Sequence, residues 1–125
     1  MAKGAMEMVA EAKREVENLT AEQVEAEVAN GATLVDLRDT AELQQKGTIP
    51  GSVHVPRGML EFHADPTTPY HKPEMDPSKR VILHCQSGGR SALAAKTLKE
   101  LGYTNVAHLE GGMNAWTAAG KPNKT

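Results

Sequence analysis

Short apolar runs alternate with amphipathic segments along the chain. Four runs have the length of buried strands: 33–38, 53–55, 81–84 and 106–109. Segments with the apolar spacing or the start signals of helices lie between and around them: 20–30, 39–44, 57–64, 92–101 and the stretch after 112. This alternation predicts an α/β domain of three layers, in which a mainly parallel sheet is covered by helices on both faces.

Two helices carry recognisable start signals. Thr20 is a predicted N-cap with Gln23 as its capping-box partner, and Gly31 is placed to end that helix. Asp39 can cap the next helix, with Glu42 at the third helical position. We therefore expect the chain to enter both helices at defined residues.

The chain divides into two predicted parts. Residues 1–18 combine apolar and charged positions as an amphipathic helix does, and we expect this extension to pack on a domain formed by residues 19–125. A total of 125 residues suits one hydrophobic core. The proline-rich stretch 65–77 is a predicted long loop that could wall a functional site.

Composition narrows the function classes. The 14 basic and 16 acidic residues offer no basic stripe for a nucleic acid, and no apolar run approaches the roughly 20 residues of a membrane span. One cysteine excludes an intramolecular disulfide and a multi-cysteine metal site. No secretory signal is visible. We expect a cytoplasmic protein with no metal and no cofactor.

The single cysteine stands where the strand 81–84 becomes a turn. The turn leads into a helix and reads Cys85-Gln86-Ser87-Gly88-Gly89-Arg90-Ser91. Amides of residues 86–91 should converge on whatever is bonded to the sulfur, and such a cup at a helix start favours a thiolate. Arg90 adds a permanent cation suited to an oxyanion. A lone cysteine is usually an inert core residue, but this context predicts a nucleophile.

Asp36 and Arg38 follow the strand that begins at residue 33. Because sites in open α/β sheets are built at the carboxyl ends of strands, these side chains could support the active loop by hydrogen bonds. The alternative is a structural ion pair that joins the strand to the next helix. We favour a supporting role over direct chemistry.

The loop and three further stretches together resemble a single-domain rhodanese. The stretches are 34–38 with Glu42, 47–52 and 109–116, and the resemblance covers about residues 19–120. It implies a five-stranded sheet and a sulfurtransferase of the thiosulfate sulfurtransferase type. Cys85 would take a sulfane sulfur from thiosulfate or a low-molecular-weight persulfide, hold it as a persulfide, and pass it to cyanide or a thiol.

Alternative functions remain open beside this one. Phosphatases of the cell-cycle type share the fold but place five residues between cysteine and arginine, whereas four separate Cys85 from Arg90. By resemblance the smaller cup suits sulfur better than phosphate or arsenate. A non-enzymatic binding module is a further alternative, as is a persulfide carrier that serves a protein acceptor.

Residues outside the loop give weaker signals. Four side chains are candidates for substrate contact: Arg57, Phe62, His63 and His71. Trp116 is a predicted core residue. The histidine spacing supports neither a metal site nor a cysteine–histidine dyad, since His84 should point to the opposite face from its neighbour Cys85.

Overall fold

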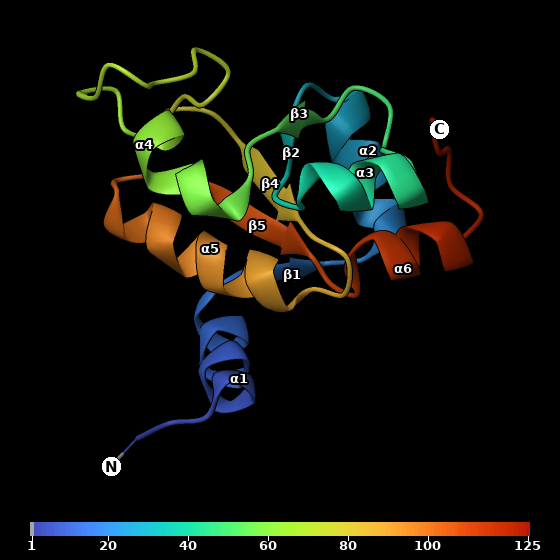
Figure 1. Ribbon diagram of the computed structural model, residues 1–125, viewed down its shortest axis with the longest axis horizontal. Helices are drawn as coiled ribbons and strands as arrows, with labels where there is room; N and C mark the ends of the chain where they lie inside the picture. Colours follow the sequence, from blue (N-terminus) through green and yellow to red (C-terminus); the bar gives the residue numbers. More distant parts are fainter. Residues whose placement is uncertain (1) are drawn as a thin grey trace.

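The computed structural model describes residues 2–125. Its elements in chain order are α1 (Ala5–Glu15), β1 (Glu17–Leu19), α2 (Ala21–Ala29), β2 (Thr33–Asp36), α3 (Thr40–Lys46), β3 (Val53–His54), the 3₁₀ turn η1 (Arg57–Met59), α4 (Leu60–Ala64), β4 (Val81–His84), α5 (Gly89–Glu100), β5 (Val106–Leu109) and α6 (Gly112–Ala118) (Figure 1). No helix within residues 2–125 is long and apolar enough to cross a membrane.

The five strands form one sheet in the order β1-β5-β4-β2-β3, and every neighbouring pair is parallel. The central strand β4 places Leu83 opposite Val35 on one side and His108 on the other. Because parallel strands end at the same edge, the carboxyl ends of β2, β4 and β5 lie together. The turn after β4 therefore starts at the middle of that edge.

The core lies on both faces of the sheet. Along β4, Val81 and Leu83 pack with the apolar residues of α4 and α5, whereas Ile82 packs with those of α2 and α6. All three side chains are fully buried, as expected for a parallel strand that is covered on both sides. The three-layer α/β prediction with a five-stranded parallel sheet is confirmed.

The N-terminal segment is joined to the domain in two ways. Val9 and Ala12 of α1 pack against Ala92 on the outer side of α5, where α1 stands apart from the sheet (Figure 1). The chain then enters β1, which pairs with β5 at the edge of the sheet. The expected division between residues 18 and 19 falls inside this strand, so the separate extension stays a prediction.

The expected helix starts are present. Thr20 Oγ1 accepts from the Gln23 amide at 3.2 Å, and Gln23 Oε1 accepts from the Thr20 amide at 2.9 Å. At the next helix, Glu42 Oε1 accepts from the Asp39 amide at 3.1 Å. The strand before it ends at Asp36 rather than at residue 38, because the Arg38 amide turns back to Asp36 Oδ1.

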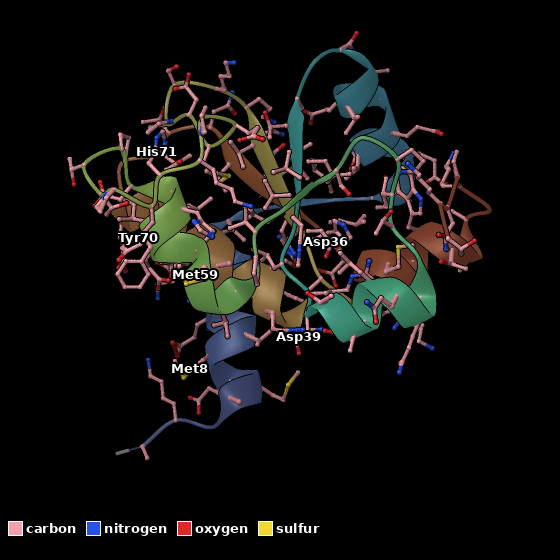
Figure 2. All side chains as sticks on the ribbon, turned by 45° about the horizontal axis from the view of Figure 1, so that its top comes forward. Met8, Asp36, Asp39, Met59, Tyr70 and His71 are labelled. Carbon is pink, nitrogen blue, oxygen red and sulfur yellow. The ribbon has the colours of Figure 1, made fainter. Side chains whose placement is uncertain are left out.

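The loop 65–77 runs past α4 at the far side of the molecule from the β4–α5 turn (Figure 1). Two histidine rings hold its conformation: a ring nitrogen of His63 in α4 contacts the Tyr70 carbonyl at 2.8 Å, and one of His71 contacts the Met75 carbonyl at 2.7 Å. Figure 2 shows Tyr70 and His71 beside α4, away from Asp36. The expectation that this loop walls the site is wrong.

Candidate active site

The turn between β4 and α5 wraps around the Cys85 sulfur. The sulfur accepts from the Gly88 amide at 3.2 Å and from the Ser91 amide at 3.4 Å. Gly88 has a φ of 100°, a left-handed conformation that costs glycine nothing. Because Cys85 is 1% exposed and lies at the start of the 12-residue helix α5, the amides and the helix dipole act on it with little screening.

Helix α6 holds the outer side of the same turn. The Met113 amide donates to the Cys85 carbonyl at 2.9 Å, and the Asn114 amide donates to the Gln86 carbonyl at 3.0 Å. These bonds keep two loop carbonyls turned toward α6. The loop amides are therefore free to face the sulfur.

Gly112 makes the contact between α6 and the loop close enough for these bonds. It has a φ of 56°, and a Cβ at this position would lie 2.7 Å from the Gln86 carbonyl carbon. We expect Gly112→Ala to lower the free energy of unfolding by at least about 2 kcal/mol, since it adds a clash to left-handed strain.

Urea unfolding checks this, with Gly102→Ala as the matched control. Gly102 has a φ of 97°, but a Cβ added there would meet open space, so its substitution carries only the strain of about 1 kcal/mol. Equal losses in the two variants would contradict the role assigned to Gly112.

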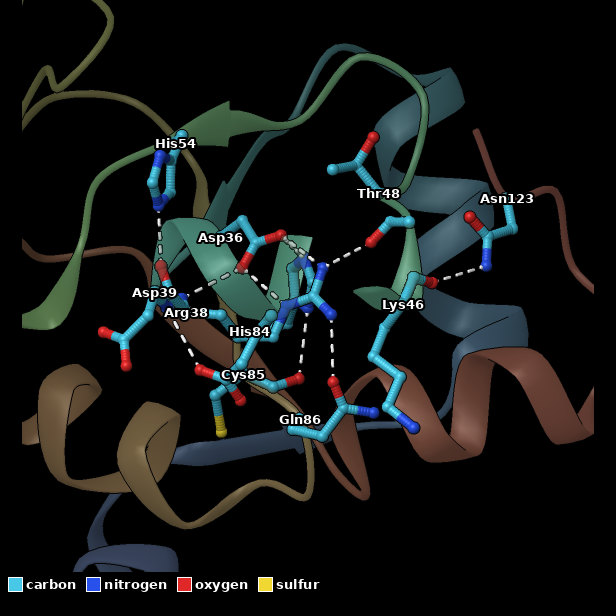
Figure 3. A network of polar contacts seen from close by, with 12 residues as sticks. Asp36, Arg38, Asp39, Lys46, Thr48, His54, His84, Cys85, Gln86 and Asn123 are labelled. Carbon is cyan, nitrogen blue, oxygen red and sulfur yellow. Dashed lines mark hydrogen bonds and ion pairs between the residues drawn. The ribbon is translucent and has the colours of Figure 1, made fainter. Parts of the chain in front are cut away.

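A buried arginine ties the sheet edge to the loop (Figure 3). Arg38 donates to both Asp36 oxygens at 3.0 and 2.8 Å, to the Gly47 carbonyl at 2.8 Å and to Gln86 Oε1 at 2.9 Å. Arg38 is 0% and Asp36 1% exposed. Burial raises the pKa of Asp36, but the Arg38 bonds and His84 outweigh it and the net pKa is lowered. Asp36 therefore stays ionised as the partner of Arg38.

Arg90 forms a two-pronged ion pair across the mouth of the site. Its two terminal nitrogens donate to the two Glu42 oxygens, both at 2.8 Å. The fork expected to face an anionic donor is thus occupied by a carboxylate. Arg90 nonetheless keeps its positive charge near Cys85.

Comparison with known proteins decides the family. The sequence-family model of the rhodanese-like domain matches residues 20–119, which is most of the chain. The chain belongs to the rhodanese-like domain family. The rhodanese resemblance of the sequence is confirmed.

Two relatives of this rhodanese-like domain have names that refer to sulfur. A sulfurtransferase of Allochromatium vinosum is 35% identical over 89 residues, covering 71% of this chain and 75% of the relative. A "Putative sulfur carrier protein YrkF" of Bacillus subtilis is 34% identical over 84 residues, or 67% of this chain. This chain spans only 40% of the length of YrkF.

One solved structure resembles nearly the whole rhodanese-like domain. It is a protein of unknown function from Rhodopseudomonas palustris that is described as a possible tyrosine phosphatase. The TM-score is 0.92 at 42% identity, with 99% of this chain and 96% of the other covered. The α1 extension is therefore included in the likeness.

The Arg90–Glu42 pair makes the stability of the rhodanese-like domain depend on pH. The Arg90 bonds lower the pKa of Glu42 from 4.5 to about 2, against the opposing effect of burial. A carboxylate whose pKa is lowered by folding stabilises the protein above pH 4.5 and loses that effect as pH falls toward 2. The pair is partly exposed, so we expect about 1 kcal/mol from it at pH 7.

Glu42→Gln tests this pH dependence. The variant should be less stable than the parent at pH 7 and approach it as pH falls below 4.5, because only the parent has a charge to lose. Thermal unfolding between pH 7 and 2.5 measures the difference. A gap that stays constant over this range would contradict the ion-pair account.

The structure brings most of the predicted site residues together. Cys85 to Ser91 form the turn around the sulfur, and Asp36 and Arg38 support it through Gln86. The other candidates lie elsewhere: Arg57 pairs with Glu61 at 3.0 Å, and exposed Phe62 stacks edge-on against Tyr70. Together with His63 and His71, these residues belong to the α4 side of the molecule. Trp116 is a core residue, as predicted.

Sequence reasoning missed two polar residues behind the sulfur. Ser91 Oγ lies 3.6 Å from Cys85 Sγ and 2.9 Å from His108 Nδ1, and His108 Nε2 lies 2.7 Å from Asn18 Oδ1. Residue spacing can suggest that a cysteine and a histidine contact each other directly. It gives no reason to expect a serine hydroxyl between them. A histidine in the middle of the strand 106–109, buried on both faces, was the available signal.

Proposed function

We propose that this rhodanese-like domain is a sulfurtransferase that carries a sulfane sulfur on Cys85. The observation that carries the proposal is the pair of amides on the sulfur, 3.2 Å from Gly88 and 3.4 Å from Ser91. Amides that are fixed before the reaction stabilise negative charge without reorganising. They suit both the attacking thiolate and the persulfide that replaces it.

The proposed reaction has two displacements at sulfur. The Cys85 thiolate attacks the outer sulfur of thiosulfate or of a low-molecular-weight persulfide, the donor's S–S bond breaks, and sulfite or a thiolate leaves. Cyanide or an acceptor thiol then takes the sulfur and frees Cys85. Arg90 supplies positive charge near the anionic donor, although Glu42 occupies its fork.

The thiol chemistry of the proposed reaction fits a compartment in which thiols stay reduced. An acceptor thiol and an unpaired cysteine both persist where disulfides are kept reduced, which fits the cytoplasm. A protein thiol is the alternative acceptor, in which case the domain is a persulfide carrier. The relative named as a putative sulfur carrier supports this persulfide-carrier alternative.

Phosphate ester hydrolysis is the second candidate, because one close structural relative is described as a possible tyrosine phosphatase. Two observations weigh against it: four residues separate Cys85 from Arg90, and the Arg90 fork that would bind a phosphate is paired with Glu42.

Parallel assays separate the two functions. Purified protein is given thiosulfate with cyanide, glutathione persulfide with a thiol, and p-nitrophenyl phosphate. We expect turnover of at least one sulfur donor and none of the aryl phosphate. Aryl phosphate turnover without sulfur transfer would overturn the proposal.

A further inference from the structure

A chain of polar contacts leads from the Cys85 sulfur through the protein to the edge strand β1. It passes through Ser91 Oγ at 3.6 Å and His108 Nδ1 at a further 2.9 Å, and ends where His108 Nε2 meets Asn18 Oδ1 at 2.7 Å. Ser91 and His108 are both fully buried. The polar atoms of these two side chains therefore have only their protein neighbours for hydrogen bonding.

Asn18 decides which nitrogen of His108 carries a proton. Its Nδ2 donates to the carbonyls of Lys13 at 2.9 Å and Val16 at 3.1 Å. Carbonyls only accept, so the NH₂ group must face them and Oδ1 must face His108. Oδ1 also only accepts, and consequently His108 Nε2 must hold a proton.

The remaining partners follow from that assignment. Neutral His108 has a bare Nδ1, which accepts from the Ser91 hydroxyl. The Ser91 oxygen is then free to accept from the Cys85 thiol. All donors and acceptors along the chain are paired while the cysteine is protonated.

A second arrangement pairs the same atoms after ionisation. The S–H bond of Cys85 breaks as its proton moves to Ser91 Oγ, and the original Ser91 proton moves to His108 Nδ1. The imidazolium then donates to Ser91, and Ser91 donates to the thiolate. One proton has moved from sulfur to nitrogen, and the net charge of the site is unchanged.

The groups around His108 are set for this exchange. Glu110 Oε1 lies 3.6 Å from Nε2 and would balance an imidazolium, while Lys13 of α1 pairs with the other Glu110 oxygen at 2.8 Å. Burial lowers the pKa of His108 to about 4, Glu110 raises it and Lys13 lowers it. The imidazole is therefore neutral while the thiol is intact, and the charge of Glu110 is what would stabilise a proton taken from Cys85.

The charged groups nearest Cys85 come from α5 and α3. Arg90 of α5 is a cation beside the sulfur, and Glu42 of α3 neutralises only part of its charge. The titratable groups on the other side of β4 form a separate network: Asp36, Arg38 and His84. His84 contacts the Cys85 carbonyl at 3.3 Å, not the sulfur.

We propose that His108 accepts the proton of the Cys85 thiol through the Ser91 hydroxyl, with Asn18 of β1 fixing the tautomer that makes this possible. The N-terminal segment is thereby part of the machinery of the site. His108 and Asn18 act through Ser91, so both are positioning residues. The inference deepens the proposed sulfur transfer, yet thiol ionisation can be measured with no sulfur donor present.

The test is the pH profile of Cys85 alkylation by iodoacetamide in the full chain. His108→Asn keeps an acceptor near Ser91 but cannot take up a proton. Its alkylation midpoint should rise by about one pH unit, so that alkylation is about tenfold slower below the midpoint. Ser91→Ala should shift the midpoint in the same direction, and the double variant should shift it no further than the larger single change.

Tyr103→Phe is the control for general destabilisation. Its buried hydroxyl donates to the Ala64 carbonyl at 2.8 Å, far from the sulfur, so its loss should leave the alkylation profile unchanged. A His108→Asn profile that matches the parent, or single shifts that add fully in the double variant, would overturn the relay.

The tautomer supplies a second test that needs no variant. Long-range ¹H–¹⁵N NMR of the parent protein should find His108 protonated at Nε2 and bare at Nδ1 while Cys85 is a thiol. A proton on Nδ1 in the neutral imidazole would overturn the proposal. An unchanged alkylation profile in His108→Asn, together with intact sulfur transfer, would contradict this inference and leave the proposed function standing.

Discussion

Cys85→Ser should abolish sulfur transfer while the fold is retained. A serine hydroxyl neither ionises near neutral pH nor forms a persulfide, so we expect the rate to fall by at least about 10³-fold. Steady-state turnover of thiosulfate with cyanide measures the loss. Because serine closely matches the size of cysteine, the melting temperature should change by only a few degrees.

Cys85→Ala separates the nucleophile from its surroundings. It removes the sulfur and the hydroxyl together, and it should be as inactive as Cys85→Ser if covalent chemistry at this position carries the reaction. Either variant turning over at the parental rate would contradict the role of Cys85.

Arg38→Met should cost about 3–5 kcal/mol of the free energy of unfolding, the range for breaking a buried ion pair. Methionine fills the aliphatic volume but leaves the Asp36 carboxylate buried without its cation. It also removes the donor to Gln86 in the active loop. Urea unfolding followed by the fluorescence of the buried Trp116 measures the change.

Two controls isolate the effect of the buried charge. Arg57→Met removes an arginine whose pair with Glu61 is half exposed, and it should cost no more than about 1 kcal/mol. Adding Asp36→Asn to Arg38→Met removes the orphaned charge and should recover part of the loss. Equal costs for Arg38→Met and Arg57→Met would show that the buried network has no special weight.

Local patterns in the sequence predict the turn around the sulfur well. The loop is determined by three features that are close together in the chain: the strand 81–84, the glycines after Cys85 and the helix that follows. The capping boxes of α2 and α3 are equally local. In these cases the residues that interact are near neighbours in sequence, so spacing carries the information.

Contacts between distant segments could not be predicted in the same way. Arg38 and Gln86 are 48 residues apart, as are Glu42 and Arg90, and His108 meets Asn18 across 90 residues. The sequence predicts site roles for Arg38, Gln86 and Arg90, but it does not predict which residues pair with them. The strand β1 has three residues, too few for a period, and its place beside β5 is what brings Asn18 to the site.

Intact-protein mass spectrometry after treatment with thiosulfate tests the central claim most directly. Glutathione persulfide is the second donor, and Cys85→Ser is treated in parallel. The account predicts that the parent gains the mass of one sulfur atom, that a reductant removes it, and that the variant gains nothing. A parent that stays unmodified with both donors, or a variant that gains the same mass, would contradict a persulfide on Cys85.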